Sequence, residues 1–207
     1  MKLKILSWNI WIYGDFEKVS KFIKETNPDV IGLQEVKDDD KNFDIINYLK
    51  ELGYDYVFVP VKHTWEEYTF MDAPAIFSKY PIVKKETHIL SETDPRGAVR
   101  ADIKVGNEII HIFNTHPVHT HQQQTELQDL QINNLIKILT LENTILIGDF
   151  NATPESSVMK EVKKVLIDTD ANSLPTWSLD IKGCSICKKQ TVDVKLDYIF
   201  VSSDLKY

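Results

Sequence analysis

The sequence has few cysteines and few arginines, and both shortages limit what the protein can do. Its two cysteines, Cys184 and Cys187, form a single Cys-X-X-Cys pair in a chain of 207 residues. A four-cysteine zinc site needs a second pair, which the sequence lacks. A thioredoxin-type redox pair opens a helix after a strand, whereas this pair follows Lys182-Gly183 in a predicted loop. We therefore predict loop cysteines without chemistry, and a metal or redox role is the less favoured alternative.

Long apolar runs and an excess of positive charge are also missing. No segment is apolar for long enough to cross a membrane, and the N-terminus lacks the apolar core of a signal peptide. The formal net charge of -7 argues against nonspecific nucleic-acid binding through a broad basic surface, although it permits a local basic or metal-bearing cleft. No linker-like segment divides the chain. We predict a cytoplasmic, monomeric protein with one domain spanning residues 1–207.

Polar residues follow a short apolar run at residues 145–155. The run 145–147 is typical of a strand buried on both faces. Asp149 and Asn151 come next, and residues two apart on an extended chain point the same way. Thr153-Pro154 then resembles a helix start. Two readings remain open for the pair: ordinary turn residues, or polar groups that share one site.

Two strands near the N-terminus also end in polar residues. The segment 2–10 reads as a strand with Asn9 near its end, where a turn residue is the simplest interpretation. The segment 29–36 is apolar until Glu35. A buried glutamate is costly without a partner, and a divalent cation or an arginine would each serve.

Two later strands repeat the pattern. The strand predicted at 108–115 is followed by His116, and the strand predicted at 192–201 carries Asp197 in its most apolar part. An unpaired buried carboxylate is expensive, so Asp197 should face a cation, a histidine or a hydrogen-bond donor.

The remaining segments alternate between helix, strand and loop patterns. Residues 62–71 are polar and aromatic and read as a surface loop. Helices are predicted where apolar residues recur every three or four positions, over 15–26, 43–52, 122–141 and 154–165.

Acids and amides without cysteine suit a hard cation such as Mg²⁺, for which Mn²⁺ can substitute. Histidine and asparagine suit an anionic oxygen. The residues at the strand ends together indicate phosphoester hydrolysis.

Six short motifs in this order resemble those of the endonuclease/exonuclease/phosphatase superfamily, whose fold is that of DNase I. They cover nearly the whole chain: Ser7-Trp8-Asn9-Ile10, Leu33-Gln34-Glu35-Val36, Ile76-Phe77-Ser78-Lys79-Tyr80-Pro81-Ile82, Asn114-Thr115-His116, Gly148-Asp149-Phe150-Asn151 and Leu196-Asp197-Tyr198-Ile199. The resemblance implies an α/β fold, a four-layer α/β sandwich of two mixed β-sheets flanked by helices.

The resemblance also implies a role for each matching residue. Glu35 is the principal Mg²⁺ ligand, and Asn9 either binds the metal ion too or contacts one of its ligands. Asp149 positions and deprotonates the attacking water, helped by Asn151. His116 donates to a phosphate oxygen.

The end of the chain departs from the family's pattern. The family closes with a strand bearing Ser-Asp-His, whose histidine pairs with the aspartate equivalent to Asp197. Here Ser203-Asp204 is followed by Leu205. We predict that this last strand is missing, through truncation rather than as a true short variant that recruits His119, His121 or a partner's residue. The chain alone is then expected to be weakly active or inactive.

Specificity is harder to predict. A phosphodiester, and among diesters nucleic acid, is the favoured substrate of this nuclease-like enzyme. Phosphatase or phospholipase action on inositol phosphates or sphingomyelin, and a non-catalytic binding module of the same fold, are the alternatives. Arg96 and Arg100, the only arginines, form either a phosphate clamp or a pair of surface charges. Trp177 either lines the pocket or fills the core.

Overall fold

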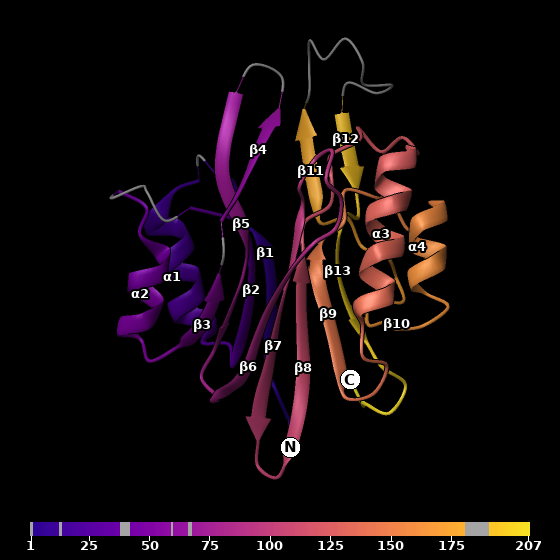
Figure 1. Cartoon of the computed structure of the whole chain (residues 1–207). Helices are drawn as coiled ribbons and strands as arrows, with labels where there is room; N and C mark the ends of the chain where they lie inside the picture. The colour runs from indigo at the N-terminus through magenta and orange to yellow at the C-terminus, as the bar shows by residue number, and fades with distance from the viewer. Residues whose placement is uncertain (1, 13, 38–41, 59, 66–67, 181–190) are drawn as a thin grey trace.

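Two mixed β-sheets form the centre of the protein in the computed structural model shown in Figure 1. The structure describes all residues except 1, 13, 38–41, 59, 66–67 and 181–190. In the first sheet the strand order is β1-β2-β5-β3, and β4 pairs with β5. Strands β1 and β2 are parallel, whereas β5 runs antiparallel to β2, β3 and β4. The bounds are β1 (Ile5–Asn9), β2 (Val30–Val36), β3 (Asp55–Phe58), β4 (Val61–Trp65) and β5 (Tyr68–Ser78).

The second sheet has the strand order β10-β13-β9-β8-β7-β6. Only β8 and β9 are parallel, and the other neighbours are antiparallel. Its strands are β6 (Ile82–Ile89), β7 (Gly97–Val105), β8 (Glu108–Thr115), β9 (Thr144–Asp149), β10 (Ile167–Asp168) and β13 (Asp197–Val201). A separate two-stranded ribbon pairs β11 (Trp177–Asp180) with β12 (Thr191–Val194).

Helices cover the outer face of each sheet (Figure 1). Helices α1 (Phe16–Thr26) and α2 (Ile45–Glu51) pack on the first sheet through one apolar cluster. Helices α3 (Glu126–Ile138) and α4 (Ser157–Val162) pack on the second sheet through another. A third cluster lies between the two sheets and includes Val30, Ile76, Ile112 and Ile147. The predicted four-layer α/β sandwich is therefore confirmed.

The sheets approach each other closely at one glycine. A Cβ atom added to Gly32, in the middle of β2, would lie 2.1 Å from Cδ1 of Ile147 in β9. Glycine at this position lets the branched side chain of Ile147 fill the space between the sheets.

Several predicted boundaries were wrong. The surface loop predicted over 62–71 is wrong for 62–65 and 68–71, because β4 and β5 pair there from Val61↔Asp72 to Trp65↔Tyr68. These residues include β-branched and aromatic types, which favour strands. The helix predicted from residue 154 begins later, since Ser156 is its N-cap and accepts a hydrogen bond from the backbone of Met159. The helix predicted over 122–141 is shorter, and its N-cap is Thr125.

The strand predicted over 192–201 is broken into β12 and β13. Asp197 is consequently the first residue of β13 and does not lie within an apolar run. Cys184 and Cys187 lie outside the described residues. Among the helices that the structure describes, none is both long and apolar enough to cross a bilayer.

Candidate active site

One edge of the sandwich gathers the polar residues that the sequence places at strand ends. Asn9 and Asp149 are the last residues of β1 and β9, and Glu35 is near the end of β2. The Asn9 side-chain amide donates to Glu35 Oε1 at 2.9 Å and to Asp149 Oδ2 at 3.0 Å. A single amide thus joins one carboxylate from each sheet.

An irregularity in β2 turns Glu35 toward Asn9. The β2–β5 register shifts between Leu33 and Val36, and Glu35 has a left-handed φ of 61°. For a residue with a Cβ this conformation is strained and persists only where its surroundings hold it. The backbone N–H of Ile12 holds it from one side by donating to Glu35 Oε2 at 2.9 Å.

Two buried amides hold the same irregularity from the other side. Asn114, on β8 of the second sheet, donates through Nδ2 to the carbonyls of Leu33 and Ala75, at 2.8 Å each. Gln34 donates to Asn114 Oδ1 at 2.7 Å. Both amides are fully buried. Asn114 therefore satisfies backbone carbonyls beside the bulge and ties it to the strand that leads into His116.

Asp149 is the most constrained acid of the site. Its Oδ1 accepts from the backbone N–H of Asn151 at 2.9 Å, and its Oδ2 lies 3.8 Å from His116 Nε2. Burial raises the pKa of Asp149 to about 6, and the nearby charge of Glu35 adds to the rise. The hydrogen bonds from Asn9 and Asn151 and the charge of Arg96 oppose it.

Asn151 is held by the loop that follows β8. It has a left-handed φ of 50°, its Nδ2 donates to the Pro117 carbonyl at 3.1 Å, and its Oδ1 lies 2.8 Å from His119 Nδ1. Because an amide oxygen only accepts, this arrangement assigns the proton to Nδ1 of His119. His119 is a site residue that sequence reasoning named only as a substitute for a missing histidine.

Asp197 lies directly opposite Asp149 in the β13–β9 pairing. The hydroxyl of Thr176 donates to Asp197 Oδ2 at 2.7 Å and accepts from the backbone N–H groups of Leu196 and Asp197 at 3.0 Å. Asp197 Oδ1 is buried and makes no hydrogen bond within the described part of the chain. Burial, followed by the charge of Asp149, raises the pKa of Asp197 to about 7.

The partner of Asp197 is thus a hydrogen-bond donor, one of the three kinds that the sequence predicted. No sequence pattern pointed to Thr176 as this partner, because Thr176 is separated from Asp197 along the chain by β11 and β12. Trp177, the next residue, is half-buried at the start of β11 opposite Val194. Asp204, at the other end of β13, accepts from the backbone of Asn143 and so lies away from Asp149.

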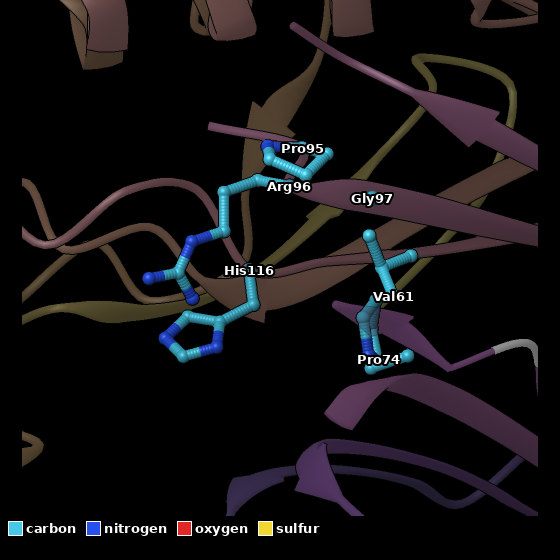
Figure 2. A pocket seen from close by; sticks show the side chains of 7 residues that line it. Val61, Pro74, Pro95, Arg96, Gly97 and His116 are labelled. Carbon is cyan, nitrogen blue, oxygen red and sulfur yellow. The ribbon is translucent and has the colours of Figure 1, made fainter. Parts of the chain in front are cut away.

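The two arginines do not form a pair. Arg96 and His116 line the same pocket and point in the same direction (Figure 2). Arg96 Nε is buried without a hydrogen bond among the described residues, and its ion pair with Asp94 spans 3.4 Å. A guanidinium group placed in this way retains donors for an anion.

Arg100 instead belongs to a structural network on β7. Its Nε donates to Asp102 at 2.7 Å, and its guanidinium lies over the Phe113 ring, 5.2 Å from the centroid. Glu86 and His111 complete the network. The structure thus brings Arg96 to the site and leaves Arg100 apart from it.

The donor atoms of the cluster fit a hard divalent cation. Glu35 and Asp149 supply carboxylate oxygens next to the amide of Asn9, and oxygen ligands are those that such cations prefer. Among the described residues, no group of three or more His, Cys, Asp or Glu side chains is arranged as a complete metal cage. A small hard cation needs no such cage, because it keeps several water ligands and takes one or two carboxylates.

A known family matches the chain over nearly its whole length. The model of the endonuclease/exonuclease/phosphatase family matches residues 6–207. The chain belongs to this family. Its members are hydrolases that act on phosphoester bonds and generally use divalent metal ions. No curated protein matches the sequence.

Solved structures of the family share the fold at low sequence identity. An endonuclease/exonuclease/phosphatase protein from Beutenbergia cavernae is 17% identical with a TM-score of 0.76, and the match covers 97% of this chain and 64% of that one. ANGEL2, a 2′,3′-cyclic phosphatase crystallised with adenosine-2′,3′-vanadate, is 16% identical with a TM-score of 0.74, covering 99% and 85%. A mannosyl-6-phosphatase from Bacteroides thetaiotaomicron is 18% identical with a TM-score of 0.67, covering 98% and 86%.

Proposed function

We propose that this protein is a Mg²⁺-dependent phosphoesterase that hydrolyses a phosphodiester at the Glu35–Asp149 cluster. The observation that carries the proposal is the Asn9 amide, which holds Glu35 and Asp149 together at hydrogen-bond distance. His116 and Arg96 stand beside this cluster and supply the cationic or donor groups that an anionic substrate needs.

Glu35 would hold the metal ion. Asn9 would position this ligand, because its Nδ2 donates to Glu35 Oε1 while its Oδ1 accepts from the backbone N–H of Trp11 at 2.9 Å. A Mg²⁺ ion bound there would polarise the phosphoryl oxygen and stabilise the leaving oxygen. The hydrogen bond from Ile12 N and the strained bulge keep Glu35 in one orientation, so the ligand is positioned before substrate arrives.

Asp149 is proposed as the general base. Its carboxylate accepts the proton of the attacking water, and its raised pKa of about 6 brings it closer to neutrality, where proton transfer is efficient. Asn151 orients Asp149 through its backbone N–H. The charge of Glu35 adds to the rise in the pKa of Asp149.

His116 and Arg96 are proposed to contact the phosphoryl oxygens. His116 has only 9% of its side chain exposed, and Arg96 has 12% exposed. Donors held at buried positions stabilise charge that grows in the transition state more strongly than donors in water.

A phosphomonoesterase is the second candidate. The fold similarity to a mannosyl-6-phosphatase favours it. Inositol phosphates fall within this class of substrates, whereas sphingomyelin is a phosphodiester and falls within the first.

Hydrolysis of two aryl esters tests the proposal. We expect Mg²⁺-dependent release of p-nitrophenol from bis(p-nitrophenyl) phosphate, with slower release from p-nitrophenyl phosphate. Asp149→Asn keeps the side chain's shape and should lower kcat by about 10²–10⁴-fold. Faster turnover of the monoester would select the second candidate. A lack of metal-dependent turnover of both esters would fit either the inactive chain expected from the sequence or a non-catalytic binding module, and the same assay on a chain extended by a Ser-Asp-His strand separates the two.

A further inference from the structure

A groove leads away from the site between two β-hairpins. Its near end is lined by His116 and Arg96, together with Val61, Pro74 and Gly97 (Figure 2). A second hollow continues from it between β4–β5 and β6–β7, and the two share Val61, Pro74 and Gly97. The groove is therefore continuous with the proposed phosphate site.

We propose that this groove binds the group esterified to the phosphate, and that this group is compact, uncharged and largely apolar. The proposal rests on the proposed function, because the His116–Arg96 end is taken as the phosphate end. It specifies a substrate class that the proposed reaction leaves open.

The polarity of the groove changes along its length. Arg96 and His116 stand at the phosphate end, whereas Ile89, Ala98 and Val99 line the far part together with two polar residues, Thr87 and His88. Ile89 is 54% exposed, so a large apolar side chain faces solvent beside the groove. An apolar group placed there removes this surface from water.

The charge of the groove disfavours a long polyanion. Beyond Arg96, no lysine or arginine lines either hollow within the described residues. A nucleic-acid strand needs a cation near each phosphate that follows the first, and the chain as a whole has a net charge of -7. A single phosphoryl group with an uncharged substituent matches this distribution.

Gly97 offers a direct way to narrow the groove. A Cβ atom added there would meet only the His88 carbonyl at 3.6 Å and Val61 Cγ2 at 3.8 Å, which are ordinary contact distances. Gly97→Ala should therefore fold normally while its methyl group occupies space in the groove. Val83→Ala, on an exposed position of β6, is the matched control.

Equilibrium binding separates this proposal from the proposed function. Calorimetry on the full chain with Mg²⁺ compares phenylphosphonate, which carries an apolar group, with inorganic phosphate, which fills only the phosphate end. Phenylphosphonate should bind more tightly than phosphate to the unsubstituted protein. Gly97→Ala should weaken the binding of phenylphosphonate by about tenfold and the binding of phosphate by less than about twofold. Val83→Ala should change the affinity for neither ligand.

Three outcomes would overturn the proposal. Phenylphosphonate could bind no more tightly than phosphate, Gly97→Ala could weaken both ligands equally, or a thymidine oligonucleotide could bind more tightly than phenylphosphonate with strong salt dependence. None of these results depends on turnover. Failure of ester hydrolysis with the expected binding pattern would therefore contradict the proposed function and leave the groove as a ligand site.

Discussion

At the scale of single residues, the site is defined by acidic side chains. The fold holds them close together although ionised carboxylates repel one another. Asp149 and Asp197 face each other across two paired strands, and Glu35 is linked to Asp149 through Asn9. The sequence predicted that these residues share a site, because it places Asn9, Glu35 and Asp149 at strand ends and Asp197 in a buried strand. Asp197 instead begins β13. Their chemical roles remain predictions. Thr176 and the orientation of His119 were beyond sequence reasoning, since both depend on contacts between distant segments.

The two facing aspartates predict how stability depends on pH. The pKa is raised to about 6 for Asp149 and to about 7 for Asp197 in the folded protein, above the unfolded value of about 3.9. Between about pH 4 and pH 7 the folded chain therefore binds protons that the unfolded chain has released. The stability that Asp149 and Asp197 contribute in their protonated form is fully present below the unfolded pKa. It is lost as the pH rises through the pKa values of the folded protein.

Thermal unfolding in a chelating buffer measures this effect. We expect Tm to fall by a few degrees between pH 5 and pH 8 through these two groups, because about 1 kcal/mol corresponds to roughly 2–4 °C for a chain of this size. Asp197→Asn removes one titrating group and should flatten the pH dependence. An equally steep or steeper fall in the variant would contradict the assignment.

At the scale of elements, the sequence predicted most strands and helices. It did not predict where several of them begin, end or break. The apolar strands β2, β8 and β9 were recognised from composition, because buried strands read as continuous apolar runs. The strands β4 and β5 lie where the sequence predicts a loop, because polar residues interrupt the apolar pattern of this segment. The break between β12 and β13 depends on Thr176. Its hydroxyl accepts hydrogen bonds from the backbone N–H groups of Leu196 and Asp197.

The bulge in β2 predicts a structural role for Asn114. Replacing it with leucine would leave the carbonyls of Leu33 and Ala75 buried without donors. Each such group costs about 1–3 kcal/mol, so Asn114→Leu should lower the free energy of unfolding by roughly 2–5 kcal/mol. Because the bulge orients Glu35, the variant should also weaken Mg²⁺ binding.

Urea unfolding with and without Mg²⁺ tests both effects. The matched control is Asn134→Leu on α3, where a half-buried amide donates to the single carbonyl of Leu90. It should cost about 1 kcal/mol and leave the Mg²⁺ effect unchanged. Equal losses in the two variants would show that Asn114 has no special link to the bulge.

At the scale of the whole molecule, the distance between the sheets sets the geometry of the site. Carboxylates from both sheets meet in one cluster, so a change in sheet spacing would separate them. Gly32→Ala places a methyl group where Ile147 and Asn114 already lie, with contacts of 2.1 Å and 3.2 Å to the added Cβ. Overpacking of this kind costs about 1–3 kcal/mol.

A double-mutant cycle measures this spacing. Ile147→Val shortens the side chain that Gly32→Ala meets, so the double variant should recover part of the stability that the single glycine variant loses. Gly97→Ala, which meets only ordinary contacts, serves as the control and should leave stability nearly unchanged. Additive losses for Gly32→Ala and Ile147→Val would contradict a direct contact between the sheets at this point.

The central claim is that strand ends from both sheets form one metal-dependent phosphoesterase site. The most direct test is a Mg²⁺ titration of bis(p-nitrophenyl) phosphate hydrolysis and of Tm, for the unsubstituted chain and for Glu35→Gln. We predict saturable activation and a rise in Tm for the unsubstituted chain, and loss of both in the variant, because glutamine keeps the shape of Glu35 without its charge. Equal metal-dependent turnover in the two proteins would contradict the account.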